Sequence, residues 1–269
     1  MTQPVFTSDL TGKVALVTGG AGILGRRFCK GLAAAGATVA VVDLYADAAD
    51  AAARDIGDGA KGFVCDVAEP DSVTSCVAAV EDHFGRIDIL LNNAATKTGD
   101  LEALFKPFEE YSLSTWREVM SVNIDGMFLM AQAVGRVMLK QGTGGSIVQT
   151  SSIYGLVGPD NRIYEGSHYL GGPINTPAVY SASKSAVIGL TRWLATYWGE
   201  QNIRVNALVP GGVASGQNEI FASKYSSRVP LGRMAEADEM VGPMLFLASA
   251  ASSYVTGHVL SADGGWTAW

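Results

Sequence analysis

One tyrosine of this chain is followed four positions later by a lysine, Tyr180 and Lys184, and none of the other eight tyrosines has that spacing. On a helix, side chains four positions apart lie on the same face, so the ammonium can favour the phenolate. Lowering a tyrosine pKa from about 10 to about 7 takes roughly 4 kcal/mol, which a partly dehydrated cleft with a further positive charge could supply. The pair therefore predicts a general acid/base. The alternative is a packed ring and a solvated amine.

A glycine-rich turn suggests a second kind of chemistry, the binding of phosphates. Gly20, Gly22 and Gly25 satisfy the pattern G-x-G-x-x-G directly after an apolar run, Val14 to Thr18, and open a helical segment. Glycine permits a tight turn and close approach of the backbone to a pyrophosphate, while the helix N-terminus offers unpaired N–H groups. The turn predicts a dinucleotide site, and the alternative is an ordinary strand-to-helix connection.

An aspartate indicates which dinucleotide is bound. Asp43 ends the next apolar run, 18 residues after Gly25, close to the expected spacing of about 20. A carboxylate there can accept hydrogen bonds from the adenosine ribose and would repel a 2′-phosphate, so NAD is favoured over NADP. Arg26 and Arg27 could assist a phosphate, although solvated helix residues are the simpler interpretation. Asp66 is predicted to bind the adenine amino group.

Alternating strands and helices must position these residues. Strands are predicted at Val14 to Thr18, Thr38 to Asp43, Gly62 to Cys65, Ile87 to Asn92, Ser146 to Ser151, Ile203 to Val209 and Val259 to Ala262. Helices are predicted at Ile23 to Ala35, Ala46 to Ile56, Ser72 to Phe84, Ser114 to Lys140, Tyr180 to Trp198 and Ala237 to Ser249. The apolar runs are nearly continuous, as in parallel strands covered on both faces. The expected fold class is α/β: a Rossmann-type doubly wound parallel sheet of about seven strands flanked by helices, in a single domain, 1–269.

The composition excludes several other classes of protein. With 269 residues, 48% of them hydrophobic, the chain can bury a core and is not disordered. A net charge of −7 without a block of Lys or Arg argues against nucleic-acid and anionic-membrane partners. Three scattered cysteines, Cys29, Cys65 and Cys76, predict neither a disulfide framework nor a metal site. Residues 1–10 have no apolar leader, and no apolar run is long enough to span a membrane, so a cytoplasmic location is expected.

Taken in order, the motifs resemble those of the short-chain dehydrogenase/reductase family over almost the whole chain. Besides the glycine turn, the matching motifs are Asp66-Val67, Asn92-Asn93-Ala94, Asn123, Ser151-Ser152, Tyr180-x-x-x-Lys184, Pro210-Gly211 and Asp263-Gly264-Gly265. The resemblance implies a catalytic tetrad: Tyr180 as general acid/base, Lys184 lowering its pKa and holding the nicotinamide ribose, Ser152 polarising the reacting oxygen, and Asn123 anchoring a proton-relay water. It implies that NAD contacts Gly19, Gly22, Ile23, Leu24, Gly25, Asp43, Leu44, Asp66, Val67, Asn93, Ala94, Ala95, Tyr180, Lys184, Pro210, Gly211, Val213 and Ser215.

Two departures from the family's pattern concern the site. Ile23 stands where classical-type members have the middle glycine of the turn. Ser152 and Tyr180 are 28 positions apart, about double the family's usual separation, whereas Ser167 stands at the customary 13. We favour Ser152, because it ends a strand where the sheet fixes a side chain at the cofactor crevice, while Ser167 lies in an irregular segment. The excess predicts an insertion at 155–178.

This insertion is the best indication of the substrate, since it is expected to pass over the mouth of the site. Its polar side chains suit a carbohydrate-like molecule, such as a sugar, polyol or sugar acid, better than a steroid or acyl chain. The expected substrate contacts are Ser152, Tyr154, Asn161, Arg162 and His168, with Arg162 as partner for an anionic group. A solvated surface loop or a subunit contact is the alternative.

The resemblance and the residues together imply an NAD-dependent oxidoreductase that transfers a hydride between a secondary alcohol or ketone of a carbohydrate-like small molecule and the nicotinamide. The alternatives are a 3-oxoacyl or other ketone reductase and a non-catalytic NAD-sensing protein. The family also implies a homotetramer or homodimer. We expect the C-terminal region, 210–269, to serve substrate binding and assembly, with Trp266 and Trp269 at a subunit interface.

Overall fold

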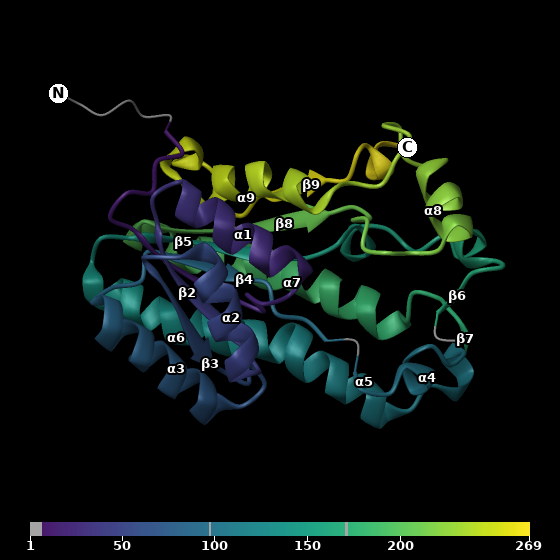
Figure 1. Ribbon diagram of the computed structural model, residues 1–269, viewed down its shortest axis with the longest axis horizontal. Coiled ribbons are helices and arrows are strands. Elements are labelled where there is room, and N and C mark those ends of the chain that lie inside the picture. The colour runs from purple at the N-terminus through teal and green to yellow at the C-terminus, as the bar shows by residue number, and fades with distance from the viewer. Residues whose placement is uncertain (1–6, 97, 170–171) are drawn as a thin grey trace.

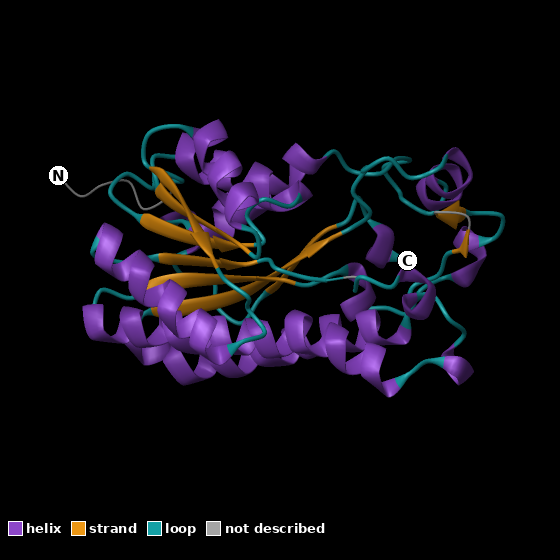
Figure 2. Ribbon diagram, turned by 60° about the horizontal axis from the view of Figure 1, so that its bottom comes forward, coloured by secondary structure: helices purple, strands orange, loops and turns teal. Residues whose placement is uncertain are grey.

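A parallel β-sheet runs between two layers of helices (Figures 1 and 2). The computed structural model describes residues 7–96, 98–169 and 172–269. The strands of the sheet are β1 (Val14–Thr18), β2 (Thr38–Asp43), β3 (Ala60–Val64), β4 (Ile89–Asn92), β5 (Gly145–Thr150), β8 (Ile203–Pro210) and β9 (Val259–Ala262). In the described residues these seven strands have the order β3-β2-β1-β4-β5-β8-β9. A separate antiparallel pair consists of β6 (His168–Tyr169) and β7 (Gly172–Pro173).

Helices cover both faces of the sheet, which makes this a doubly wound single-domain α/β fold. They are α1 (Ile23–Ala34), α2 (Ala46–Ile56), α3 (Pro70–Phe84), α4 (Leu101–Leu104), α5 (Leu113–Met120), α6 (Gly126–Gln141), α7 (Ala178–Trp198), α8 (Glu219–Ser226) and α9 (Val241–Ala248). On one face, α1, α2 and α9 pack against the strands through residues such as Phe28 and Leu247. On the other face, α3, α6 and α7 do so through residues such as Met130 and Leu194.

The strands are buried because helices lie on both sides of them. All five residues of β1 are buried, and neighbouring side chains enter opposite cores: Leu16 packs with α3, α6 and α7, and Val17 with α1, α2 and α9. Burying one such aliphatic side chain contributes about 1.5–3 kcal/mol. Because β1 pairs with β2 on one side and with β4 on the other, the strand order reverses there. In such sheets, ligands bind outside the carboxyl ends of the strands at the reversal.

The predicted fold class is confirmed, and each predicted strand of the sheet is found within two residues of its expected bounds. The predicted helix Ser114 to Lys140 is not continuous: a π-helical turn, Ser121–Asp125, separates α5 from α6. α5 begins at Leu113, one residue before the predicted start, and its cap is Ser112, whose hydroxyl accepts the Thr115 N–H. Sequence analysis also missed α4, α8, β6 and β7.

The C-terminal aromatic residues are placed differently from each other. Trp266 is 3% exposed and stacks on Tyr225 with 4.3 Å between ring centroids, so its expected position at a subunit interface is wrong for this ring. Trp269 is 76% exposed, and its indole N–H donates to the Arg228 carbonyl (3.1 Å). The reason is local packing, because α8 supplies Tyr225 as a partner for Trp266 within the same chain.

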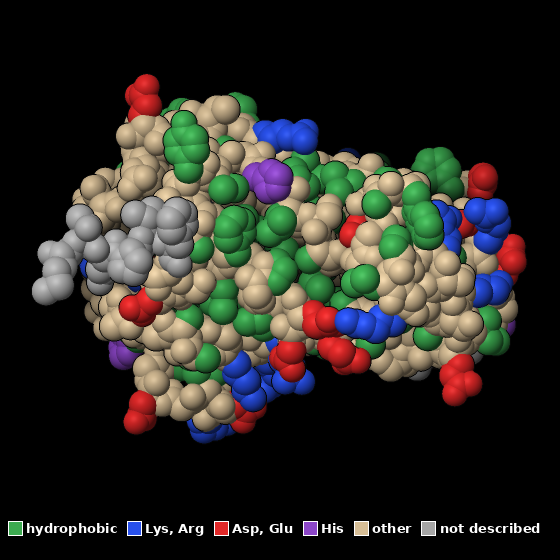
Figure 3. All heavy atoms as spheres, turned by 90° about the horizontal axis from the view of Figure 1, so that it is seen from above, with side chains coloured by type: hydrophobic (Ala, Val, Ile, Leu, Met, Phe, Trp, Pro, Cys, Tyr) green, Lys and Arg blue, Asp and Glu red, His purple; other side chains and the backbone are tan. Residues whose placement is uncertain are grey.

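Charged side chains are spread over the face that Figure 3 shows. On the face in Figure 3, basic side chains occur in small separate groups, several of them beside acidic ones. Within the described ranges, no helix is long and apolar enough to cross a bilayer. The same residues contain no cluster of three His, Cys, Asp or Glu side chains that could hold a metal ion. The three cysteines are free and buried.

Candidate active site

Tyr180 and Lys184 both lie on α7, as their spacing predicts. The Lys184 Nζ is 5.8 Å from the centroid of the Tyr180 ring and donates to the Thr150 carbonyl at the end of β5 (3.0 Å). The Lys184 carbonyl accepts the Ser151 hydroxyl (2.7 Å). The carboxyl end of β5 therefore fixes the buried amine beside the tyrosine ring.

Tyr180 lines a cavity of about 440 Å³, and Ser152, two residues after β5, lines the same cavity. Ser167, the serine at the customary spacing, is not among the described residues that line it. Ser167 is buried instead, and its hydroxyl donates to Asn218 (3.4 Å). The serine at the end of the strand is therefore the one that shares a cavity with Tyr180, whereas spacing along the chain would have selected a serine outside the described cavity lining.

Burial shifts the pKa of Tyr180 and that of Lys184 toward the neutral form. It raises the pKa of Tyr180 above its ordinary value, while the Ser152 side chain lowers it. It also lowers the pKa of Lys184 to about 8, because a buried ammonium loses its hydration. The expected lowering of the Tyr180 pKa by Lys184 is not found in the protein alone, since desolvation of the phenolate has the largest effect and acts in the opposite direction.

Asn123 lies in the π-helical turn between α5 and α6 and is completely buried. Its Oδ1 accepts the backbone N–H of Thr96 (2.9 Å), and its Nδ2 donates to the Ser183 hydroxyl on α7 (3.4 Å). Thr96 lines the cavity. Turns of this kind are frequent at functional sites because they displace one residue from the regular helix. Here the turn allows Asn123 to connect the segment after β4 with α7.

The glycine turn between β1 and α1 is tightly packed. A Cβ at Gly25 would lie 2.0 Å from the Gly19 carbonyl oxygen, and Gly19 has a positive φ of 62°. Gly22 precedes α1 and has no side chain to cap it, so the first N–H groups of the helix can bind an anion. Ile23, the first residue of α1, lines the cavity. The turn fits a dinucleotide pyrophosphate next to the space that Ser152 and Tyr180 line.

Asp43 holds the glycine turn as well as ending β2. Its Oδ2 accepts the Ala21 N–H (3.0 Å), and its Oδ1 accepts the Leu44 N–H (2.9 Å). Arg26 donates to the Ala21 carbonyl (2.9 Å) and pairs with Asp55 (3.0 Å). The carboxylate and the turn therefore have a fixed position relative to each other, and Arg26 already has an acidic partner.

The neighbouring strand ends carry the other predicted cofactor residues. The hydroxyl of Thr18, at the end of β1, accepts the N–H groups of Asn93 (2.9 Å) and Ala94 (3.0 Å) after β4. After β3, Asp66 accepts a backbone N–H two residues later (3.0 Å), and Val67 is buried. The predicted residues after β1, β3 and β4 thus lie at one end of the sheet.

The segment after β8 completes this end of the molecule. Gly211 follows Pro210, and a Cβ at Gly211 would lie 2.7 Å from the Asp263 Cα. Val213 forms an isolated bridge with Ala235. Gly211 and Ser215 line the cavity together with Tyr180. Predicted cofactor residues from distant parts of the chain are therefore brought to the same space as the predicted catalytic residues.

Comparison with known proteins identifies the family. The family model described as enoyl-(acyl carrier protein) reductase matches residues 19–267. The structure of a short-chain type dehydrogenase/reductase from Mycobacterium marinum is 33% identical in sequence, with a TM-score of 0.84 over 97% of each chain.

The chain belongs to the short-chain dehydrogenase/reductase family.

Other members resemble it over nearly their whole length. A D-threitol dehydrogenase from Mycolicibacterium smegmatis is 38% identical over 97% of this chain and 95% of the relative. A gluconate 5-dehydrogenase from Burkholderia cenocepacia, solved with NADP and tartrate, is 33% identical with a TM-score of 0.86, over 98% and 99% of the two chains. This short-chain dehydrogenase/reductase is therefore an oxidoreductase that acts on CH–OH groups.

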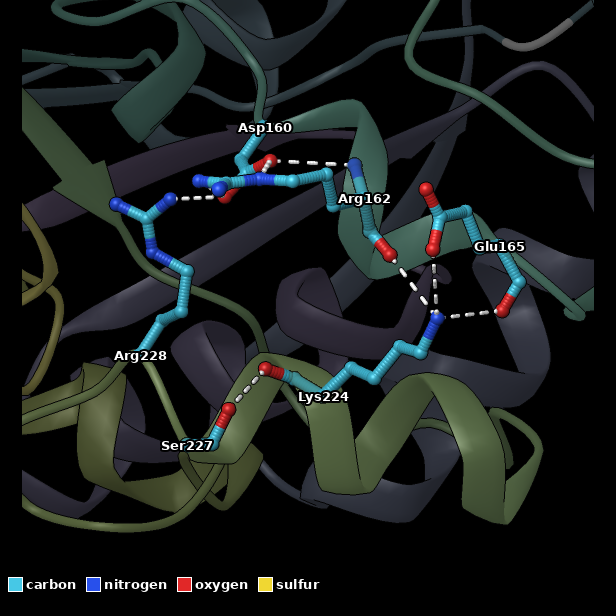
Figure 4. A network of polar contacts seen from close by, with 6 residues as sticks. All are labelled: Asp160, Arg162, Glu165, Lys224, Ser227 and Arg228. Atoms are coloured by element: carbon cyan, nitrogen blue, oxygen red, sulfur yellow. Dashed lines mark hydrogen bonds and ion pairs between the residues drawn. The ribbon is translucent and has the colours of Figure 1, made fainter.

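Two of the predicted substrate contacts of this short-chain dehydrogenase/reductase lie away from the cavity. Tyr154 and His168 line it, but Asn161 and Arg162 are not among the described residues that do so. The Arg162 side chain is 80% exposed, and its Nε donates to Asp160 (2.8 Å), as Figure 4 shows. The ion pair with Asp160 explains why Arg162 does not face the cavity.

Sequence analysis missed several residues that line the cavity, among them Tyr164, Asn175 and Thr176. It also missed α8, although that helix has a recognisable start: Asn218 accepts the Phe221 N–H (2.9 Å). An asparagine before helix-forming residues is a standard signal for a helix N-terminus. Tyr164 ends a short 3-10 helix, Asn161–Tyr164, whereas Asn175 and Thr176 lie in irregular backbone, where local sequence carries no comparable signal.

Proposed function

We propose that this chain is an NAD-dependent dehydrogenase that oxidises a secondary alcohol of a carbohydrate-like substrate, such as a sugar, polyol or sugar acid, to a ketone or lactone. One observation carries the proposal: Ser152 and Tyr180 line the same cavity, and Lys184 is buried 5.8 Å from the tyrosine ring. The similarity to the D-threitol dehydrogenase supports this class of substrate. Ile23 and Ser215 line the cavity too, which supports binding of the nicotinamide beside the substrate.

Each member of the tetrad has a role in the proposed reaction. Tyr180 Oη takes the proton of the substrate hydroxyl, and the Ser152 hydroxyl donates a hydrogen bond to the reacting oxygen as it becomes a carbonyl. The C–H bond breaks, and hydrogen leaves with its electron pair as hydride. When bound, the oxidised nicotinamide supplies the hydride acceptor and a positive charge that favours the phenolate. Lys184 adds positive charge beside the ring and holds the ribose, and Asn123 anchors the water that passes the proton on.

The preference for NAD rests on the charges around the glycine turn. Asp43 is anchored by the Ala21 N–H, so its carboxylate cannot easily move away from a 2′-phosphate. Arg26 pairs with Asp55 (3.0 Å), and Arg27 with Asp238 (3.5 Å). Both arginines that could assist such a phosphate already have acidic partners, which supports NAD as the cofactor.

Two regions are proposed to build the substrate site. Segment 155–178 is proposed to be an insertion of this classical-type member, and it contributes Tyr164 and Thr176 to the cavity lining. The C-terminal region, 210–269, contributes residues that include Met234. Because both regions line the space next to Tyr180, we propose that they determine which alcohol is bound.

The function is tested by following NADH absorbance while sugars, polyols and sugar acids are supplied, with NAD and NADP in separate assays. Tyr180→Phe is expected to lower kcat by at least about 100-fold, since general acid/base catalysis commonly contributes 10²–10⁴-fold. The same variant should retain its Kd for NAD within about twofold, because the ring is preserved. Full turnover by Tyr180→Phe would exclude the proposed base.

A ketone reductase acting on 3-oxoacyl chains is the second candidate. Apolar side chains, including Leu101, Leu104 and Phe105, line part of the cavity. The matching family model is described as an enoyl-(acyl carrier protein) reductase. NADH oxidation with a 3-oxoacyl thioester, together with no activity toward any polyol or sugar, would favour this candidate.

The chain is also proposed to form a homotetramer or homodimer in the cytoplasm. Trp193 and Tyr197 on α7 stack with 4.8 Å between centroids, yet they are 59% and 61% exposed. Large exposed aromatic surfaces are typical of interfaces. The free, buried cysteines are compatible with a reducing compartment. Sedimentation equilibrium giving only monomer would contradict the assembly.

A further inference from the structure

One wall of the cavity carries a connected set of hydroxyl groups. The Tyr154 hydroxyl lies 3.1 Å from that of Tyr164, which is hydrogen-bonded to the Thr176 hydroxyl. All three residues line the cavity. Burial raises the pKa of Tyr154 and of Tyr164, so these phenols stay protonated near neutral pH. Each hydroxyl of this set, which we call the hydroxyl chain, can therefore both donate and accept a hydrogen bond.

Asn175, which precedes Thr176 of the hydroxyl chain, has a side-chain oxygen that lacks a hydrogen-bond donor among the described residues. Its Nδ2 donates to the Phe105 carbonyl (2.9 Å), which fixes the orientation of the amide. Its Oδ1 is buried and has no hydrogen-bond partner within the described part of the chain. A buried acceptor without a donor costs free energy. A hydroxyl group can satisfy it, whereas an ionised carboxylate, which only accepts, cannot.

The basic side chains near this wall are engaged elsewhere. Arg162 and Arg228 both pair with Asp160, and the Lys224 ammonium donates to the Arg162 and Glu165 carbonyls (3.1 and 2.8 Å), as Figure 4 shows. Among the described residues that line the cavity, none is Lys, Arg, Asp or Glu, and the one histidine is His168, which is exposed. Burying a carboxylate without a lysine or arginine partner is unfavourable. These surroundings therefore favour an uncharged ligand.

Another part of the cavity lining is apolar and complements the C–H groups of such a ligand. Its residues include Leu101, Phe105, Ile174, Phe221 and Met234. A molecule with hydroxyl groups on one side and C–H groups on the other could form hydrogen bonds with the polar part of the lining and apolar contacts with the other part.

We propose that the substrate is an uncharged polyol or vicinal diol, whose neighbouring hydroxyls are bound by Asn175 and the hydroxyl chain Tyr154, Tyr164 and Thr176. This inference rests on the dehydrogenase function proposed above. In it, the substrate hydroxyl next to the reacting carbon donates to Asn175 Oδ1, and a further one exchanges hydrogen bonds with the hydroxyl chain. These residues determine specificity, while Tyr180 and Ser152 act on the reacting group.

The first test compares each polyol with the aldonic acid of the same carbon skeleton, for chains of four to six carbons. We expect kcat/KM for the best polyol to exceed that for its acid by at least about tenfold, since leaving buried polar groups unpaired opposes the acid. A preference for the acid would overturn this inference and leave the dehydrogenase function intact. No turnover of any polyol, acid or sugar with NAD or NADP would overturn both.

Variants of the hydroxyl chain then test whether it determines substrate specificity. Tyr164→Phe is expected to raise KM for the polyol about tenfold while changing kcat less than about twofold, because the lost hydrogen bond lies away from the reacting atoms. Thr176→Val should act in the same direction. The matched control is Tyr111→Phe, which removes a buried hydroxyl that has no partner within the described ranges and does not line the cavity. Equal KM values for Tyr164→Phe and Tyr111→Phe would refute the role of the hydroxyl chain.

One further variant concerns Lys97, which is adjacent in sequence to a residue of the cavity lining. Lys97 follows the cavity residue Thr96 and lies outside the described residues. If the ligand is uncharged, Lys97→Gln should leave the ratio of polyol to acid kcat/KM within about twofold. A Lys97→Gln enzyme that selectively loses activity on the acids would show that a cation binds a substrate carboxylate, contrary to the inference.

Discussion

At the scale of single residues, the site keeps polar and charged groups in surroundings that oppose their ionisation. Burial moves the pKa of Tyr180 up and that of Lys184 down to about 8. Both shifts favour the neutral forms, so a further positive charge is needed before Tyr180 can act as a base near neutral pH. Asp43, in contrast, has two backbone N–H donors, so its carboxylate serves the local structure as well as cofactor selection.

Asp43→Asn is expected to weaken the preference for NAD. Asparagine keeps an oxygen that can accept the Ala21 N–H, but it has no charge to repel a 2′-phosphate. We expect the ratio of kcat/KM for NAD to that for NADP to fall at least about tenfold, equivalent to roughly 1.4 kcal/mol. Initial rates with each cofactor measure this ratio. An unchanged ratio would show that Asp43 does not face the adenosine ribose.

Lys184→Met is expected to abolish turnover and to change how stability depends on pH. The pKa of Lys184 is about 8 in the fold and 10.5 ordinarily. Between these values the unfolded chain binds more protons, so wild-type stability rises with pH across this window, by on the order of 3 kcal/mol in total. Below pH 8 the cost of burying the ammonium is fully present. The methionine variant lacks this contribution.

The measurement is urea unfolding of both proteins at several values between pH 7 and 10. We expect the free energy of unfolding of the wild type to increase relative to that of Lys184→Met as the pH rises. If the free energy of unfolding has the same pH dependence in both proteins, burial does not shift the pKa of Lys184.

At the scale of elements, helices can approach one another and the sheet where a glycine stands at the contact. Gly135 on α6 faces Trp198 on α7, and a Cβ at Gly135 would lie 2.5 Å from the indole ring. The π-helical turn before α6 places Asn123 next to α7. The packing of α6 against α7 therefore also positions one member of the proposed tetrad.

Gly135→Ala is expected to destabilise the protein by about 1–3 kcal/mol, because the methyl group would force the buried Trp198 ring to move. Gly242→Ala on α9 is the matched control, since Gly242 is exposed and an added Cβ would meet nothing within 4 Å. Urea unfolding of the two variants measures the difference. If both glycines tolerate alanine equally, α6 and α7 do not pack as closely as described.

At the scale of the whole molecule, segments far apart in the sequence enclose the substrate cavity. In Figure 1, α4, β6, β7 and α8 all lie at the same end of the molecule. Asp160 joins two of these segments, because it pairs with Arg162 in its own segment and with Arg228 after α8 (Figure 4). The two arginines hold the pKa of Asp160 below its ordinary value, so the pairs persist at neutral pH.

Asp160→Asn is expected to loosen the cavity wall without unfolding the protein. Ion pairs at the protein surface contribute little to global stability, and the Arg162 partner is 80% exposed, so Tm should change by no more than a few degrees. KM for the substrate should rise about three- to tenfold, because segment 155–165 and α8 lose a connection. Cleavage of this segment by a protease should become faster. The control is Asp58→Asn, at an exposed position of the α2–β3 connection, and equal KM values for the two variants would contradict the coupling.

The sequence by itself determined the features that depend on local patterns. Continuous apolar runs predicted the strands of the sheet because helices cover both of its faces. The glycine turn, Asp43 and the Tyr180–Lys184 spacing predicted a cofactor and a catalytic region, and the structure brings these regions to one end of the sheet.

Only the tertiary structure decided features that depend on partners distant in sequence. The burial of Trp266 needs Tyr225 from α8, and the outward position of Arg162 follows from its pair with Asp160. The direction of the Tyr180 pKa shift depends on how completely the surrounding segments remove water from the phenol. Local sequence specifies which conformations a segment prefers, whereas desolvation and pairing arise only when separate segments are packed together.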